Sequence, residues 1–313
     1  MTHALLIPLM AGIISEVPTG GQLKEPFGTE FDTKGTPYVV EMISGNRLFR
    51  LENEGKLEKL ADGFNGPHNL AVLPDGDILI GDTWAGNVKR YDAETKKVTT
   101  QPGYEAPKGK EKGMGPYCIT LTPDSKTLLI ANLLQIHAID LETGKGRVVA
   151  GNGKKGKPED GAAALDAPLV DPRAVGQDSK GNIYILERGG NALRVVDTSG
   201  KIRTVVNASG KKGNSGDGGP GLEATMNGPK HLCIDIDDTV LIADAENHVV
   251  RRFDPKSGMI TRIAGTGKNG KAGLGGEPTK CELARPHGVT IHPLTKEIWI
   301  TDSYNNRILK MTR

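Results

Sequence analysis

The chain has 313 residues, of which 40 are Lys or Arg and 38 are Asp or Glu, so its formal net charge is only +2. This balance argues against nucleic acid as a partner, because phosphate binding usually brings a clear excess of basic residues. No apolar run approaches the roughly 18–20 residues of a membrane span, and the hydrophobic content of 36% excludes collagen. Three scattered cysteines argue against a disulfide framework or a cysteine metal site.

The first apolar segment, residues 4–14, resembles the apolar part of a signal peptide. No Lys or Arg precedes it, however, and residues 9–15 (LMAGIIS) are similar to residues 261–267 (TRIAGTG). We therefore predict a strand over about residues 7–15. A secreted or periplasmic location would require a signal peptide before Met1, so the sequence leaves the compartment open.

A repeat follows, and each copy opens with a proline. The six prolines, at spacings of 41, 49, 56, 57 and 57 residues, are Pro26, Pro67, Pro116, Pro172, Pro229 and Pro286. Each opens a β-rich run, a polar turn and a second β-rich run. A polar residue ends that second run 15 or 16 positions after the proline: Glu41, Asp82, Asn132, Glu187, Asp244 or Asp302. Six copies at nearly fixed spacing establish a repeat protein.

Each copy continues into a third and a fourth short run, so one repeat predicts a four-stranded antiparallel sheet. Such sheets bury both faces only when they pack side by side, which favours an all-β, six-bladed β-propeller. The last repeat ends after its third strand, residues 307–311. The N-terminal strand is expected to complete that blade, which closes the ring and makes residues 1–313 one domain.

Two segments carry a resemblance to a known repeat family. Residues 304–308 (YNNRI) after Thr301 and Asp302, and residues 243–248 (ADAENH), resemble the NHL repeat. The linkers in residues 209–221 and 222–229 are similar to linkers of bacterial NHL propellers. The resemblance covers essentially the whole chain and implies the fold, but NHL propellers include lyases, hydrolases and binding modules.

Strand alternation places one set of side chains at one mouth of the channel. In a blade, the first strand starts on the face where the second strand ends. The residues after the six prolines should therefore form a ring: Phe27, His68, Tyr117, Arg173, Lys230 and His287. Four are basic or imidazole and none is acidic, so this ring should bind a metal or an anion rather than only line a wet channel.

The loops after the second strands add Trp84, Arg188, Glu246 and Tyr304 near the same mouth. Trp84 and Tyr304 could instead pack between blades. We expect the side-chain oxygens of the polar residues that end the second strands to accept backbone N–H bonds from the tight loops that follow. Of the acidic residues, Glu30 and Glu187 could reach the mouth. His231 follows Lys230, and strand alternation predicts that it points away from the ring.

Two glycine-rich linkers, residues 151–156 and 265–270, fit the pattern G-x-G-x-x-G. A dinucleotide site also needs a helix after the glycines, and neither segment is followed by a helical pattern, so we expect no nucleotide cofactor. The lysine pairs at 154–155 and 211–212 are expected to make the mouth electropositive.

The strand starts at His68 and His287 also resemble those that supply zinc-binding histidines in the peptidyl-hydroxyglycine amidating lyase family. That family uses three such histidines, and here Arg173 occupies the third position. Arg188 and Tyr304 resemble the arginine and tyrosine of that family, but they come from different blades. The resemblance thus implies a zinc site at His68 and His287, with other ligands in the remaining positions.

A weaker resemblance links the chain to gluconolactonase-like propellers, which hold calcium through oxygen ligands in the channel. Here that metal could be bound only through Glu30, Asn69 or Asn132. Zinc is therefore the first expected metal and calcium the second.

The leading hypothesis is a lyase or hydrolase, expected to be a monomer, that acts on a small anionic or sugar-like substrate at the mouth. His68 or His287 would serve as general base or metal ligand, and Tyr117 or Tyr304 would pass a proton. Substrate-binding residues would be Arg173, Arg188, Lys230, Glu30 and Trp84. The alternative is a non-catalytic NHL module that binds a protein or carbohydrate partner.

Overall fold

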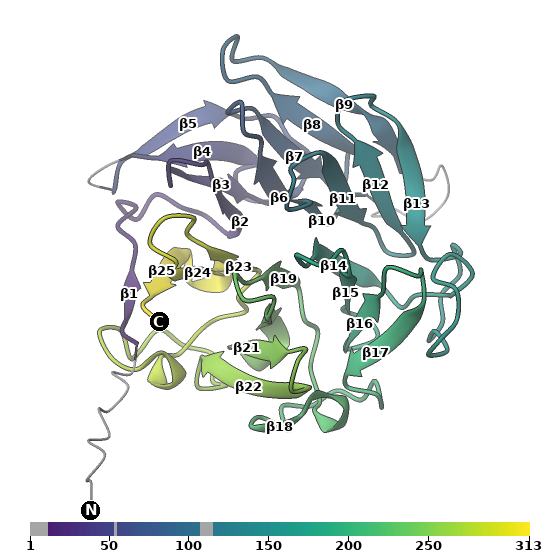
Figure 1. Cartoon of the computed structure of the whole chain (residues 1–313). Coiled ribbons are helices and arrows are strands. Elements are labelled where there is room, and N and C mark those ends of the chain that lie inside the picture. Colours follow the sequence, from purple (N-terminus) through teal and green to yellow (C-terminus); the bar gives the residue numbers. More distant parts are fainter. Residues whose placement is uncertain (1–11, 53–54, 107–114) are drawn as a thin grey trace, which may run out of the picture.

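The computed structural model describes residues 12–52, 55–106 and 115–313. Six antiparallel sheets stand around a central axis (Figure 1). The predicted six-bladed β-propeller is therefore confirmed. Within the described ranges, no helix is long and apolar enough to cross a membrane.

The first three blades follow the chain in order. Blade one contains β2 (Pro26–Phe31), β3 (Pro37–Glu41), β4 (Arg47–Leu51) and β5 (Leu57–Ala61). Blade two contains β6 (Pro67–Val72), β7 (Ile78–Asp82), β8 (Asn87–Tyr91) and β9 (Val98–Glu105). Blade three contains β10 (Cys118–Leu121), β11 (Thr127–Ala131), β12 (Ile136–Asp140) and β13 (Gly146–Ala150).

The last three blades carry the longer linkers. Blade four contains β14 (Pro172–Gln177), β15 (Ile183–Glu187), β16 (Ala192–Val196) and β17 (Ile202–Val206). Blade five contains β19 (His231–Ile234), β20 (Val240–Asp244), β21 (Val249–Asp254) and β22 (Met259–Ala264), with the short β18 (Gly219–Pro220) on its outer edge. Blade six contains β23 (Gly288–Ile291), β24 (Ile298–Asp302) and β25 (Arg307–Met311). The described ranges also contain four short 3-10 turns with assigned bounds: η2 (Gly221–Glu223), η3 (Ala245–Asn247), η4 (Pro278–Lys280) and η5 (Ser303–Asn305).

The N-terminal strand closes the ring as expected. β1 (Ile14–Glu16) pairs antiparallel with β25, and Ile14 lies opposite Met311. The strand was predicted over residues 7–15, of which residues 7–11 lie outside the described ranges. The last blade therefore combines a strand from one end of the sequence with three from the other (Figure 1).

Replacing Ile14 with alanine should lower the free energy of unfolding by about 2–5 kcal/mol, because its fully buried side chain belongs to the core of the closing blade. Urea unfolding followed by circular dichroism measures this change. The matched control is Ile13→Ala, because the neighbouring side chain is 55% exposed and its loss should cost little. Equal effects of both changes would contradict the closing role of β1.

The apolar core lies between neighbouring blades, where the faces of two sheets pack. Between blades six and one, for example, Trp299 and Ile308 are buried in one cluster with Val39 and Phe49. This packing leaves the inner strands, β2, β6, β10, β14, β19 and β23, in contact around the channel.

The polar residues that end the second strands are buried and fasten each blade to the segment that enters it. Five of them accept an N–H bond from the residue two positions before the proline of their own blade; the pairs are Glu41 with Lys24, Asp82 with Asn65, Glu187 with Val170, Asp244 with Asn227, and Asp302 with Ala284. Within the described ranges, the predicted side-chain bonds to backbone N–H groups of the following loop are found only for Asn132, which accepts from Leu134 and Gln135. Asp244 and Asp302 accept instead from side-chain amides of that loop, those of Asn247 and Asn305.

Each inner strand opens with an extra residue, the one directly after the proline. In blades one, two and four the register shifts at this point. In the other three blades the backbone amides of Tyr117, Lys230 and His287 donate to carbonyl groups on the second strand. Each acceptor residue is already paired with the residue that follows the donor, so the donor is extra in the pairing. Such a bulge redirects side chains, so two successive residues can both face the channel.

Candidate functional site

The six residues after the prolines come together at the mouth of the channel, and each is buried, with 4–8% of its surface exposed. The ring centroid of Phe27 lies 4.9 Å from that of His68 and 4.1 Å from that of His287. The two imidazoles are 6.2 Å apart, and Tyr117 lies 5.5 Å from His68. We call these six side chains the mouth ring.

His287 has a defined tautomer. Its Nδ1 lies 2.8 Å from the carbonyl oxygen of Arg285, which can only accept, so Nδ1 carries the proton. Its Nε2 therefore holds a lone pair when the ring is neutral. Tyr304 stacks on the imidazole at 5.8 Å between ring centroids. This arrangement makes Nε2 of His287 available as a base or a ligand.

Both imidazoles of the mouth ring are neutral near pH 7. Burial, reinforced by the positive charge of Arg173, holds the pKa of His68 well below its ordinary value. Burial and the charge of Lys230 do the same to the pKa of His287. Because cations contribute to both shifts, a bound anion would raise these pKa values and make the imidazoles stronger bases.

Arg173 is held in the ring by an aromatic face and a carboxylate. Its guanidinium lies 3.8 Å from the ring centroid of Tyr117, and its Nε is 3.8 Å from Oδ1 of Asp171. Arg188 donates to the other oxygen of Asp171 at 3.0 Å. Nε of Arg173 and Oδ1 of Asp171 are both buried without a hydrogen-bond partner among the described residues. An unsatisfied buried guanidinium N–H at this mouth favours an anionic ligand.

A second cationic group lies on blades five and six. Nζ of Lys230 is 3.6 Å from Oε1 of Glu246, which also accepts from Arg285. Arg285 donates to the hydroxyl of Tyr304 at 2.9 Å and lies over its ring. Burial alone would raise the pKa of Glu246, but the hydrogen bond from Arg285 and the charge of Lys230 lower it. Glu246 is therefore ionised and offsets one of the two positive charges.

The sequence did not point to Asp171 and Arg285, although each directly precedes a repeat proline. This position has a positive φ in five blades: Glu25 (49°), Gly66 (72°), Asp171 (54°), Gly228 (55°) and Arg285 (47°). Three of the six repeats have glycine there, which accepts this conformation without strain. A charged residue in its place is strained, and such strain tends to be kept at functional sites. The presence of a charged residue where other repeats have glycine was therefore the feature of the sequence that could have pointed to Asp171 and Arg285.

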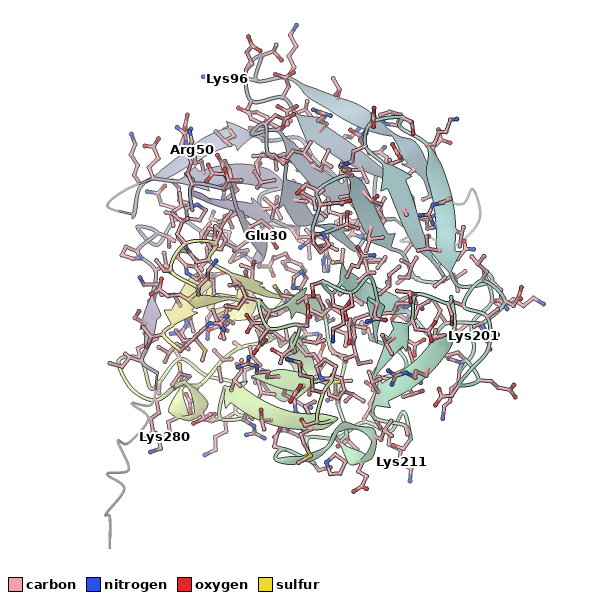
Figure 2. The ribbon with its side chains drawn as sticks, in the orientation of Figure 1. Glu30, Arg50, Lys96, Lys201, Lys211 and Lys280 are labelled. Atoms are coloured by element: carbon pink, nitrogen blue, oxygen red, sulfur yellow. The ribbon has the colours of Figure 1, made fainter. Side chains whose placement is uncertain are left out.

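The other predicted residues lie in different places. Trp84 packs over Gly66 and is 48% exposed, and Tyr304 is 46% exposed above His287. Glu187 does not reach the mouth, because its carboxylate is bound by Val170 and Arg194. Figure 2 shows Lys211 at the outer edge of the ring, away from the channel, so the positive charge of the mouth comes from other residues.

His231 points into the channel, contrary to the prediction from strand alternation, because Lys230, directly before β19, is an extra residue in the pairing with β20. Its Nε2 accepts a hydrogen bond from the amide of Asn69 at 3.2 Å, and its Nδ1 donates to the carbonyl of Val289 at 3.1 Å. Burial lowers the pKa of His231 to about 4, so the ring is neutral. Because β6 and β19 are opposite in the ring of inner strands, this bond crosses the channel.

Glu30 lies beyond that bond, near the middle of the ring in Figure 2. It lines a cavity together with His231, Cys233 and Thr290, and no mouth-ring residue lines that cavity. The structure thus separates Glu30 from the other predicted substrate-binding residues.

The donor set at the mouth suits an anion better than zinc or calcium. Within the described ranges, no three His, Cys, Asp or Glu side chains are grouped to hold a metal. The charged members of the mouth ring are the cations Arg173 and Lys230, which are not ligands for a metal in that form. Asn132 is bound in its own turn, and Glu30 lies beyond Asn69, so the oxygen ligands considered for calcium do not converge at the mouth.

Comparison of sequences gives one family and several distant relatives. The family model of the Teneurin NHL domain matches residues 37–215. NHL repeat-containing protein 2 of Bos taurus is 24% identical over 282 residues, which cover 78% of this chain and 38% of that protein. Teneurin-1 of Caenorhabditis elegans is 25% identical over 260 residues, which cover 75% of this chain and 8% of that protein. The chain thus spans less than half the length of these relatives.

Comparison of structures shows the fold alone, because the identities are low. An auxiliary nutrient binding protein from Bacteroides thetaiotaomicron has a TM-score of 0.73 and 16% identity, over 96% of this chain and 76% of that one. An inactive histidine-to-alanine variant of virginiamycin B lyase from Staphylococcus aureus, with quinupristin, has a TM-score of 0.63 and 16% identity, over 96% and 99%. A gluconolactonase-family protein has a TM-score of 0.62 and 11% identity, over 96% and 91%.

Proposed function

Because the chain belongs to the NHL-repeat family described by the Teneurin NHL domain model, and that fold is shared by enzymes and binding proteins alike, we propose its function from the chemistry of the mouth. It is an enzyme that binds a small carboxylate- or phosphate-bearing substrate at the mouth ring and cleaves it by elimination or hydrolysis. The observation that carries this proposal is a neutral, oriented imidazole beside buried cations.

The cations supply the binding half of the proposal. Four positive side chains (Arg173, Arg188, Lys230 and Arg285) face two carboxylates (Asp171 and Glu246) at the mouth. The local excess of positive charge suits a substrate with one or two negative charges. The same cations would stabilise negative charge that develops on a carbonyl or carboxylate oxygen during the reaction.

The imidazole supplies the catalytic half. Nε2 of His287 takes a proton, either from the carbon next to the substrate carboxylate or from the attacking water. In elimination the electron pair of that C–H bond forms a double bond as the bond to the leaving oxygen breaks. In hydrolysis the water oxygen first bonds to the carbonyl carbon, and the bond from that carbon to the leaving oxygen then breaks. Burial raises the pKa of Tyr117, so its hydroxyl stays protonated and can give a proton to the leaving oxygen.

A substrate panel tests the proposed activity. The purified protein is incubated with lactones, cyclic depsipeptides and esters of carboxylic and phosphorylated acids, and products are identified by mass spectrometry in ¹⁸O-labelled water. Elimination gives an unsaturated product that carries no ¹⁸O, whereas hydrolysis gives a product that carries ¹⁸O from the water. Binding of panel members without turnover would instead support the non-catalytic binding module, and neither binding nor turnover would overturn the proposal.

Anion binding at the mouth should depend on pH through Lys230. Burial, together with the charges of Arg188 and Arg173, lowers the pKa of Lys230 to about 8. The charged form binds an anion, so affinity is present below this pKa and is lost as pH rises through it. Between one unit below and one unit above that value, the affinity for malonate should fall about tenfold. Isothermal titration calorimetry at constant ionic strength measures the change.

The control for this titration is Lys230→Met, which should bind malonate more weakly and without that pH dependence. A tenfold fall that persists in this variant would assign the titration to another group. An affinity independent of pH in the unchanged protein would contradict the binding role of Lys230.

A further inference from the structure

The channel has a second compartment on the other side of the Asn69–His231 hydrogen bond. It opens on the face opposite the mouth ring, because the turns between first and second strands line its rim, including Pro123, Ser179 and Ile236. Its volume is about 390 Å³, and small-molecule sites commonly have volumes of about 300–1,000 Å³. We call it the far cavity.

Small residues stand beside the Asn69–His231 hydrogen bond above the far cavity. Asn69 and His231 follow the mouth ring on opposite blades, and three of the other blades have Gly28, Ala174 and Gly288 at the same position. A Cβ on Gly28 would lie 3.3 Å from the Asn69 amide nitrogen. The Asn69–His231 hydrogen bond and this close approach therefore narrow the channel between the mouth ring and the far cavity.

The charge of the far cavity is opposite to that of the mouth. Its described lining contains Glu30, Asp235 and Asp238 but no Lys or Arg. Asp238 is occupied by the amide and hydroxyl of Ser179, and Asp235 forms ion pairs with Arg252 and Arg313.

Glu30 differs from these two carboxylates. It receives a hydrogen bond from Thr290 at 3.2 Å, and no cation within the described ranges lies at ion-pair distance from it. Burial raises its pKa to about 7, as expected for a carboxylate without a compensating charge. It is the carboxylate at the inner end of the pocket that is left to a ligand.

The rest of the wall is apolar or neutral. Apolar side chains come from four blades: Leu121, Val175, Leu232, Ile234 and Ile291. Thr120 and Thr290 also line it, and the hydroxyl of Thr290 donates to Glu30. Calcium takes about 6–8 oxygen ligands, several of them charged, which one free carboxylate and two hydroxyls do not provide. An ammonium group needs only one carboxylate and a few acceptors, and an attached carbon chain would cover the apolar wall.

We propose that the far cavity binds a small organic amine, with its ammonium group on the Glu30 carboxylate and its carbon chain against the apolar wall. The site is independent of the proposed reaction at the mouth, because the Asn69–His231 hydrogen bond lies between the two compartments.

Titration with n-butylammonium chloride tests this proposal, with n-butanol, sodium butyrate and calcium chloride as comparison ligands. The titration is run above the pKa of about 7 of Glu30, where this carboxylate is ionised. Butylammonium should bind with a dissociation constant on the order of 1 mM, in the range that so small a ligand can reach. Protein-observed NMR or calorimetry measures the affinity.

Two variants locate the binding. Glu30→Gln keeps the shape of the side chain and should weaken butylammonium binding at least about tenfold, the effect of losing one charge-assisted contact. Glu246→Gln, which removes a carboxylate from the mouth instead, should leave this affinity unchanged. Circular dichroism confirms that both variants are folded. The proposal fails if butylammonium does not bind, if Glu30→Gln binds it equally well, or if butanol, butyrate or calcium binds as tightly.

Discussion

Replacing Arg251 with methionine is expected to lower the free energy of unfolding by about 3–5 kcal/mol, a large share of the total of about 5–15 kcal/mol for a typical protein. Arg251 is fully buried in blade five and lies between two carboxylates. Its Nε donates to Asp217 at 2.8 Å, and its Nη1 lies 3.5 Å from Oδ2 of Asp244. Its remaining N–H groups bind the carbonyl oxygens of Ser215 and Thr225. Methionine would fill much of the volume but would remove four hydrogen bonds and the positive charge that Arg251 places between the two carboxylates.

Urea unfolding measures this loss, and Arg50→Met provides the matched control. Arg50 also faces two carboxylates, Glu52 and Glu58, but it lies at the outer part of blade one (Figure 2) and is partly exposed. Its replacement should cost about 0–1 kcal/mol, as for surface ion pairs. Adding Asp244→Asn to Arg251→Met should recover part of the loss by removing the unpaired buried charge. Similar losses for Arg251→Met and Arg50→Met would contradict this account.

Replacing His287 with alanine is expected to lower turnover of any substrate found by the panel about 10²–10⁴-fold, the usual contribution of a general base. Affinity for malonate should change little, because the anion is held by Arg173, Arg188 and Lys230. Steady-state kinetics and calorimetry measure the two quantities separately. The expected pattern is a fall in kcat with binding retained.

His68→Ala is the comparison that assigns the roles. His68 lies in the same ring, but no hydrogen bond fixes its tautomer among those described, so its loss should lower kcat less than loss of His287. A larger effect of His68→Ala would transfer the role of base to that residue. Activity that survives both changes would remove imidazole catalysis from the proposal.

Much of the fold could be predicted because each blade corresponds to one copy of a sequence repeat. The prolines at fixed spacing and the missing fourth strand of the last repeat lead directly to six blades and to closure by β1. The mouth ring followed from strand alternation alone, since one position repeated six times has to surround the axis.

The rest of the site depends on details that alternation does not contain. The bulge that opens each inner strand turns His231 inward, and the sequence pattern has no separate mark for it. Asp171 and Arg285 act through a left-handed backbone conformation that becomes evident only when repeats are compared at the position before the proline. Glu30 comes three residues after Phe27 on β2, so it lies past Asn69, and the pattern at the position after the proline does not predict that depth.

The hydrogen bond between Asn69 and His231 also bears on how substrate enters and product leaves the mouth ring. Because this bond crosses the channel between the mouth ring and the far cavity, we expect products to leave the mouth ring by the face at which the substrate enters. Product that lingers there would exclude the next substrate molecule. Simple competitive inhibition by product is therefore the kinetic pattern to expect from an enzyme built on this ring.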